Sequence, residues 1–281
     1  MTSPLSKLIV IALLSGALGM VGACGGDDAD DAGDGNGNQL TLLEPVLVDE
    51  IGSVAVNMAF PNGPPGCLAV VPNPWTDTDA DEIPDTADFE FDAVGCAFDW
   101  GDASGTVFGV ATITDLGTDL GYTNSLTAMT HVFTESDPVV TVTRVLDGTR
   151  VVSGTRQVLG MVEDLSTAIT ATSGGAAAMI SELSVTFTAD AGGEIHFGVG
   201  VPLPPGQYEF GGTLTWTEDG ETTVFAVTTE TPVVYDADCP SPYPVQGVVW
   251  LEVTDGPEPG RLVVGWNGCE SLMTMDWEPA P

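Results

Sequence analysis

Strict alternation of apolar and polar residues marks the stretch that decides the fold class, Leu183-Ser184-Val185-Thr186-Phe187-Thr188. The same period of two recurs in Ile195-His196-Phe197-Gly198-Val199 and in Thr213-Leu214-Thr215-Trp216-Thr217. This pattern, enriched in Thr, Val and aromatic residues, predicts β-strands with one buried and one solvated face. We therefore expect each of these three stretches to be a strand.

Short turn signals separate the alternating stretches and predict how the strands connect. Three glycine-containing pairs favour tight antiparallel hairpins, and they are Asp147-Gly148, Gly192-Gly193 and Asp219-Gly220. Pro204-Pro205-Gly206 predicts a loop before a strand at Gln207–Trp216. The segment Ser166–Ala178 is ambiguous and also fits a short helix, whereas Val245–Val253 and Arg261–Trp266 read as a terminal pair of strands.

Together these signals predict an all-β protein. We expect an antiparallel meander of roughly a dozen strands, either barrel-like with up-and-down topology or a sandwich. It forms a single domain over residues 41–281, with an Asp-rich loop inserted at 72–92. Hydrophobic residues make up 43% of the chain, which is enough for a core.

The N-terminus has the features of an export signal. A basic residue, Lys7, precedes an apolar run from Leu8 to Val21. That run is shorter than the roughly 20 residues that a membrane-spanning helix needs. Residues 1–23 are therefore interpreted as a signal peptide.

The residues Val21-Gly22-Ala23-Cys24 resemble the lipobox of bacterial lipoproteins. The resemblance implies cleavage before Cys24, lipid on its thiol, and attachment of the chain to a membrane in the cell envelope. Gly25 stands after the cysteine where an aspartate would retain the protein in the inner membrane, which by the same resemblance favours the outer membrane. The alternative is an ordinary secretory signal, with Cys24 taking part in a disulfide.

A strongly acidic composition follows the signal. Residues 24–40 begin with Cys24 and are otherwise mostly Gly, Asp and Asn, and we interpret them as an extended tether that holds the β domain away from the bilayer. Removal of Lys7 leaves four arginines against 41 acidic residues. This charge excludes nucleic acid as a partner, because phosphate binding needs clustered basic residues.

The remaining four cysteines predict two disulfides. Their even number suits an oxidising compartment, and three pairings are open. We favour Cys67–Cys96 and Cys239–Cys269, because each closes a local excursion between strands. Each bridge of this loop size contributes about 3–4 kcal/mol in the chain-entropy model.

One stretch carries the spacing of a cation site. Between Cys67 and Cys96, carboxylates stand at positions 1, 3, 5, 9 and 12 of a twelve-residue loop, with a backbone carbonyl available at position 7. A hard cation such as Ca²⁺ needs oxygen ligands of this kind. The expected ligands are Asp77, Asp79, Asp81, Ile83 (through its carbonyl), Asp85 and Asp88.

This loop resembles the thrombospondin type 3 repeat and related EF-hand-like calcium loops, whose pattern is D-x-D-x-D-G-x-x-D-x-x-D. It departs from that pattern at position 6, where Glu82 replaces the glycine that makes a sharp turn. We expect a modest structural site for Ca²⁺, with the affinity of extracellular modules, about 10⁻⁴–10⁻³ M. The alternative is an acidic surface loop without an ion.

The sequence carries no recognisable catalytic motif. The two histidines, His131 and His196, are interpreted as surface or packed residues rather than as bases. Arg144 and Arg150 flank the expected Asp147-Gly148 turn and would then lie on different faces. Together with Arg156 they either pair with acids across strands or form an anion-binding patch.

The function expected from these features is non-enzymatic. We predict a membrane-anchored lipoprotein that displays an acidic, calcium-stabilised β domain for envelope structure, adhesion or partner binding. A barrel-like carrier of a small molecule is the alternative, and a hydrolase that uses paired carboxylates is a third hypothesis.

Overall fold

The computed structural model describes residues 46, 50–51, 58–61, 66–99, 103–117, 120–136, 139–172, 174–236, 244–268 and 274–280. Within them a single sheet of 12 strands forms the framework. The strands are β1 (Leu68–Val71), β2 (Thr86–Asp99), β3 (Ala103–Asp115), β4 (Gly121–Ser136), β5 (Val139–Gly154), β6 (Val158–Ala171), β7 (Ala176–Ala189), β8 (Gly206–Glu218), β9 (Glu221–Tyr235), β10 (Gln246–Asp255), β11 (Gly260–Asn267) and β12 (Thr274–Pro279).

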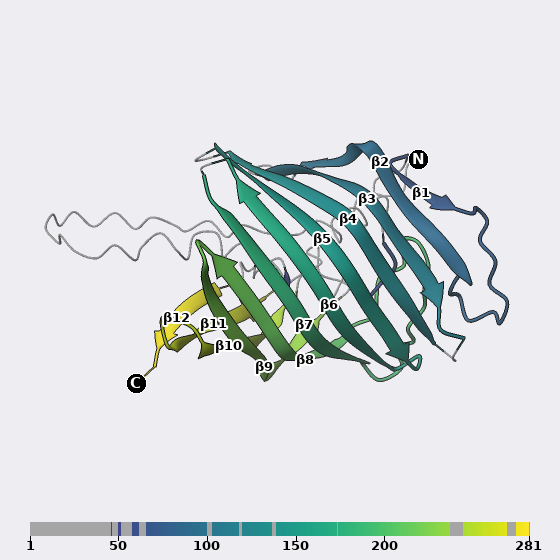
Figure 1. Cartoon of the computed structure of the whole chain (residues 1–281). Helices are drawn as coiled ribbons and strands as arrows, with labels where there is room; N and C mark the ends of the chain where they lie inside the picture. Colours follow the sequence, from purple (N-terminus) through teal and green to yellow (C-terminus); the bar gives the residue numbers. More distant parts are fainter. Residues whose placement is uncertain are drawn as a thin grey trace, which may run out of the picture.

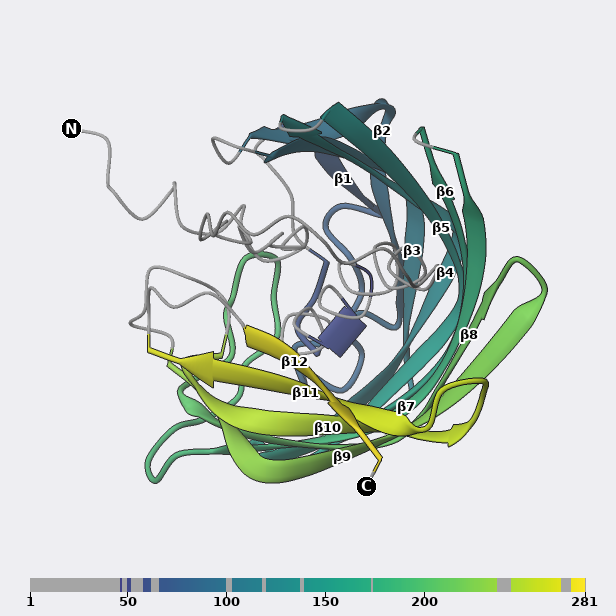
Figure 2. The same ribbon diagram turned by 90° about the vertical axis from the view of Figure 1, so that its left-hand side faces the viewer.

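The sheet is an uninterrupted antiparallel meander. Each strand is hydrogen-bonded to its neighbours in sequence, from β1 through to β12 (Figure 1). The sheet curls strongly around one concave side, yet among the described strands β1 and β12 remain edges that do not pair with each other (Figure 2). The predicted all-β meander is confirmed, and its barrel-like curvature stops short of closure.

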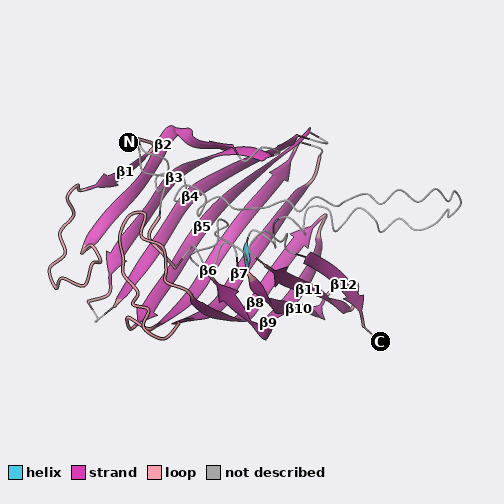
Figure 3. Ribbon diagram, turned by 180° about the vertical axis from the view of Figure 1, so that it is seen from behind, coloured by secondary structure: helices cyan, strands magenta, loops and turns pink. Residues whose placement is uncertain are grey.

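The concave face holds the core because apolar residues occupy alternate positions of the strands. In β6 and β7, buried and exposed residues alternate along nearly the whole strand. A short helical segment that includes Glu50 and Ile51 lies inside the curl, on the concave side (Figure 3). The outward side chains of the same two strands, including Asp164 and Glu182, face solvent.

An aromatic cluster closes one part of this core. The ring of Phe60 stacks on Phe197 with centroids 5.3 Å apart and meets Tyr122 edge-on at the same distance. The Tyr122 hydroxyl donates to the carbonyl of Met58 at 2.9 Å, which ties the segment 58–61 to β4.

The Asp219-Gly220 turn forms as predicted. Glu218 pairs with Glu221 across it, and both central residues have positive φ (51° and 84°). Two consecutive positive φ values define the tight turn that suits the twist of a hairpin. The terminal strands were also located correctly, because β10 and β11 cover Val245–Val253 and Arg261–Trp266 to within a few residues.

The expected turn at Asp147-Gly148 is wrong, because both residues lie inside β5. Gly148 has φ +140°, and a Cβ there would come within 2.2 Å of the Asp164 carbonyl oxygen. The carboxylate of Asp147 accepts from the Ala128 N–H at 2.7 Å, where β4 carries a register shift. The pair therefore serves a close strand contact and a bulge instead of a turn.

Arg144 and Arg150 consequently lie on one strand and on the same face. Both are buried on the concave side, six residues apart in β5. The prediction that a turn separates them onto different faces is wrong for the same reason as the turn itself.

Two further predictions of local structure are corrected. Ile195–Val199 is not a strand but part of the connection between β7 and β8, residues 190–205, here called the β7–β8 loop. Its alternation is real, with Ile195 and Phe197 buried and His196 exposed, but its N–H groups bond to loop partners. The ambiguous stretch Ser166–Ala178 spans the end of β6 and the start of β7 and contains no helix among its described residues.

Candidate metal centre

The aspartate loop, residues 77–88, connects β1 to β2 and runs into β2 at Thr86. Its first three acidic residues converge. Asp77, Asp79 and Asp81 each offer a carboxylate oxygen, and the three oxygens lie within 4.8 Å of one another. A group of this composition and size can hold a metal ion.

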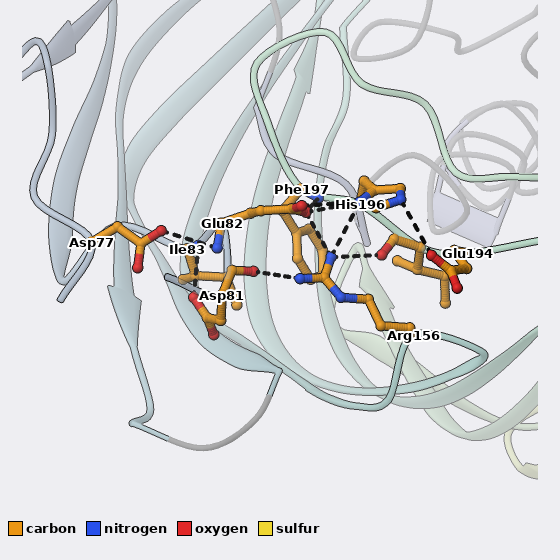
Figure 4. Close-up of polar contacts among 9 residues, drawn as sticks. Asp77, Asp81, Glu82, Ile83, Arg156, Glu194, His196 and Phe197 are labelled. Atoms are coloured by element: carbon orange, nitrogen blue, oxygen red, sulfur yellow. Dashed lines mark hydrogen bonds and ion pairs between the residues drawn. The ribbon is translucent and has the colours of Figure 1, made fainter. Parts of the chain in front are cut away.

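Backbone hydrogen bonds to two of these carboxylates shape the loop. Asp77 accepts from the N–H of Ala80 at 2.7 Å. It also accepts from the N–H of Glu82 at 3.0 Å (Figure 4). Asp81 accepts from the N–H of Ile83 through Oδ1 at 2.8 Å. These bonds wrap the chain around the carboxylates.

The other oxygen of Asp81 is in an unusual position. Asp81 is only 8% exposed, and its Oδ2 is buried with no hydrogen-bond partner among the described residues. Burial raises the pKa of this carboxyl; the N–H of Ile83 lowers it, and the charges of Asp79 and Asp115 raise it further. A buried carboxylate oxygen without a partner is costly, and a cation is the partner that its charge calls for.

The remaining predicted ligands lie outside this three-carboxylate group. Asp85 accepts from the N–H and the hydroxyl of Thr78, at 2.9 and 2.7 Å. Asp88 belongs to β2 and accepts from the Thr112 hydroxyl of β3 at 2.7 Å. Ile83 is fully buried in the core. The structure thus gathers positions 1, 3 and 5 of the loop and gives the side chains of positions 9 and 12 other partners.

Glu82 takes the conformation of the glycine that it replaces. Its φ is +80°, in the left-handed region that costs a non-glycine residue about 1–2 kcal/mol. Its carboxylate accepts from Arg156 Nη1 at 2.6 Å and from the Phe197 N–H at 3.0 Å, and lies 3.0 Å from His196 Nδ1. Partial burial raises the pKa of Glu82, but the bonds from Arg156, His196 and Phe197 outweigh it and lower the pKa to about 2.

Arg156 bridges three segments of the chain. It lies between β5 and β6, and its Nη2 donates to the carbonyl of Asp81 at 3.1 Å. Its Nη1 donates to the carbonyl of Ile195 at 2.9 Å as well as to Glu82. We call Glu82, Arg156 and His196 the Glu82 clamp, because they join the aspartate loop to the β7–β8 loop (Figure 4).

The sequence did not reveal the clamp. Glu82 is 74 residues from Arg156 and 114 residues from His196, so no local pattern connects them. The only signal was the departure itself, an acidic residue where the calcium-loop pattern has glycine. Asp115, whose charge acts on Asp81, was also missed, because it stands at the end of a different strand, β3.

A second polar network lies on the concave face. Arg150 Nε donates to Glu163 at 2.6 Å, and Arg144 Nη2 donates to Glu50 at 2.7 Å, with all four side chains buried. Burial and the charge of Glu163 raise the pKa of Glu50. Burial also acts to raise the pKa of Glu163, but the charge of Arg150 and the hydrogen bonds with Glu50, Ser181 and Arg150 outweigh it and lower the pKa.

Of the three arginines expected to pair with acids across strands, Arg150 does so with Glu163, whereas the partners of Arg144 and Arg156, Glu50 and Glu82, lie outside the sheet. Besides the two buried pairs and the clamp, Arg261 bonds to Glu278 across β11 and β12, Nε donating at 2.6 Å. The Arg261 guanidinium also lies 3.9 Å from the ring centroid of Trp250.

A cavity of about 40 Å³ borders the buried network, with Glu50, Asn124, His131, Arg144 and Arg150 as its polar lining. Pockets for drug-sized ligands have about 300–1,000 Å³. This cavity therefore does not favour a small-molecule carrier.

Two of the five cysteines lie in the described part of the chain, and the other three lie outside it. Cys67 and Cys96 form a disulfide, as predicted, with Cα atoms 5.5 Å apart. It joins the start of β1 to β2 and brackets the aspartate loop. Cys24, Cys239 and Cys269 lie outside the described residues, as do the signal peptide and the tether.

Comparison with known proteins finds no matching family model, no matching curated protein and no matching solved structure. None of the helical segments in the described part of the chain has the length and apolar character needed to span a membrane. The geometry of the sites above therefore carries the functional argument.

Proposed function

We propose that this chain is a non-enzymatic lipoprotein, anchored through lipid on Cys24 at the cell envelope, most simply in the outer membrane. It displays an acidic β domain for envelope structure, adhesion or partner binding. Its aspartate loop binds one Ca²⁺ that stabilises the displayed domain.

The buried Oδ2 of Asp81 is the observation that carries the calcium proposal. Asp81 belongs to a group of three aspartates that each offer one carboxylate oxygen within 4.8 Å of the others, and its Oδ2 has no hydrogen-bond partner among the described residues. Three negative charges at this spacing repel one another unless a cation lies between them. The disulfide beside the loop and the acidic surface both suit an exported domain.

Calcium fits this loop better than the other common divalent cations. All three side chains offer carboxylate oxygens, which suit hard cations rather than zinc or copper. Mg²⁺ demands near-ideal octahedral geometry and keeps several waters, whereas Ca²⁺ accepts six to eight ligands in flexible arrangements. Backbone carbonyls of the loop and water would complete such a shell around Asp77, Asp79 and Asp81.

Calorimetric titration of the mature chain in detergent with CaCl₂ tests the metal proposal. We expect saturable binding of one equivalent in the range of about 10⁻⁴–10⁻³ M. The variant Asp79→Asn/Asp81→Asn should lose it, and the matched control Asp164→Asn/Asp190→Asn, which removes the same charge at exposed positions, should retain it. Absence of saturable binding up to about 10 mM Ca²⁺, or equal loss in both variants, contradicts the proposal.

The anchor is tested by mass spectrometry of the protein expressed with its signal in a diderm bacterium. We expect the N-terminal peptide to begin at Cys24 and to carry diacylglycerol, and the protein to sediment with outer membranes. The Cys24→Ala variant should be soluble or remain uncleaved. An unmodified N-terminus at any other residue of the exported protein would overturn the lipoprotein assignment.

A further inference from the structure

We propose that cation binding at Asp77, Asp79 and Asp81 controls the docking of the β7–β8 loop, and that Glu82 and Arg156 transmit the control. This inference rests on the calcium site proposed above and concerns what occupancy of that site changes. The two segments share no strand pairing, so the contacts of the clamp are the route between them.

Glu82 is part of the aspartate loop, and its backbone bonds to one of the carboxylates there. Its N–H donates at 3.0 Å to Oδ2 of Asp77, a carboxylate of the three-carboxylate group. Its neighbour Asp81 is another member of that group and has a buried carboxylate oxygen, and the carbonyl of the same Asp81 accepts from Arg156 at 3.1 Å. The backbone that presents the Glu82 side chain is therefore fixed by the groups that would surround the ion.

The side chains of Glu82 and Arg156 bind the β7–β8 loop. The Glu82 carboxylate accepts from the Phe197 N–H at 3.0 Å and contacts His196, while Arg156 donates to the Ile195 carbonyl at 2.9 Å. These are bonds to three consecutive residues of the loop. A rotation of Glu82 away from its left-handed conformation would break the carboxylate contacts together.

The docked loop covers apolar surface. Ile195, Phe197 and Leu203 are buried, and Phe197 stacks on Phe60 and meets Tyr122 edge-on. Release of the loop would expose these side chains to solvent. It would also break the hydrogen bonds from the Ile195 N–H to the Arg156 carbonyl and from the Phe197 N–H to Glu82, so the state of the loop can be followed by amide exchange.

Repulsion sets the direction of the coupling. Without a cation, three carboxylates within 4.8 Å of one another favour loop conformations that separate them, and these do not hold Glu82 at φ +80°. With a cation the loop is fixed and the carboxylate of Glu82 is placed for Arg156 and Phe197. Because coupling is reciprocal, loss of the clamp must weaken cation binding by the factor by which the cation favours docking, commonly about 5–150-fold.

The variant Arg156→Gln distinguishes this coupling from the direct effect of the Arg156 charge on cation affinity. Removal of a positive charge beside a cation site strengthens cation binding by Coulomb's law. The proposal requires the opposite, because the clamp is lost. Arg261→Gln is the matched control, since it removes the same charge from β11, where Arg261 pairs with Glu278 of β12, away from the aspartate loop.

The experiment is hydrogen–deuterium exchange and calorimetry on the mature chain in detergent, with CaCl₂ as the probe. In the wild type we expect Ca²⁺ to slow exchange in the amides of residues 194–199. In Arg156→Gln we expect this protection to disappear and the calcium Kd to rise about tenfold, with Arg261→Gln unchanged. Arg156→Lys keeps the charge but lacks the fork that reaches Asp81, Glu82 and Ile195 at once, and should lie between.

Two outcomes distinguish this inference from the function it rests on. If the wild type binds no Ca²⁺, the calcium proposal fails and this one with it. If the wild type binds Ca²⁺ but exchange at 194–199 does not respond, or if Arg156→Gln binds as tightly as the wild type or more tightly, the coupling is overturned while the calcium site stands. The wild-type exchange measurement decides the question even if an Arg156 variant does not fold.

Discussion

Arg150 and Glu163 face each other across β5 and β6, with Nε 2.6 Å from the carboxylate and both side chains buried on the concave face. The Ser181 hydroxyl donates to the other oxygen of Glu163 from the next strand. Three successive strands are thus joined by one buried carboxylate. Such a group stabilises the fold only while each of its partners is in place.

Removal of one partner should be far more costly here than at the surface. Glu163→Gln removes the carboxylate charge that faces the buried Arg150 and the Ser181 hydroxyl, so we expect a loss of about 3–5 kcal/mol in the free energy of unfolding. Glu278→Gln breaks the Arg261–Glu278 pair, whose side chains are 35% and 50% exposed, and should cost less than about 1 kcal/mol. Urea unfolding of the two variants measures both values. Similar losses in the two variants would contradict the role given to the buried pair.

Acid should destabilise the protein through His131. Burial and then the charge of Arg150 lower the pKa of His131 to about 4. In the unfolded chain it is about 6.5, so between these values the unfolded state binds more protons and stability falls as pH falls. We expect His131 to account for about 2 kcal/mol of the stability lost between pH 7 and pH 5.

The His131→Gln variant, compared with the wild type by urea unfolding at both pH values, isolates this contribution. All other titrating groups are common to the two proteins, so the difference between their pH dependences reports on His131 alone. If the two proteins lose the same stability between pH 7 and pH 5, His131 is not held neutral in the folded protein.

Two glycines that look alike in the sequence should respond differently to alanine. At Gly220, in the tight turn, an added methyl group would meet only open space but φ is +84°, so Gly220→Ala should cost about 1–2 kcal/mol. At Gly148 the added Cβ would also lie 2.2 Å from a backbone oxygen of β6, so Gly148→Ala should cost about 2–4 kcal/mol. Thermal unfolding ranks the two, and the reverse order would contradict the close contact between β5 and β6.

The fold was predictable because its signal is local. Alternation within β7 and β8 fixes which side chains face the core, and Asp219-Gly220 fixes a hairpin. The Asp147-Gly148 pair failed because a glycine required for a positive φ inside a strand has the same local appearance as one required for a turn. Only the pairing of β5 with β4 and β6 distinguishes a glycine inside a strand from a glycine in a turn.

The candidate site was predictable in part, for a similar reason. Asp77, Asp79 and Asp81 are close in sequence, so their spacing alone indicated a cation group. Glu82 was seen only as a defect in the pattern, because its partners Arg156 and His196 come from distant segments. A residue that breaks a local rule is where a long-range contact should be sought.

The last prediction concerns Cys239 and Cys269, which follow β9 and β11 in the sequence. Gln246, at the start of β10, pairs with Val234 of β9 on one side and with Asn267 of β11 on the other, so β9 and β11 end at the same end of the sheet. Strand spacing places these ends about 10 Å apart.

We expect non-reducing peptide mapping to show Cys239 linked to Cys269, with no free thiol at either. The same single bridge is lost in Cys239→Ser, in Cys269→Ser and in the double variant. Each should therefore lose about 3–4 kcal/mol in the free energy of unfolding. If the double variant instead loses as much stability as the two single variants together, the two cysteines have separate partners. A peptide that links Cys239 to Cys24 would show the same.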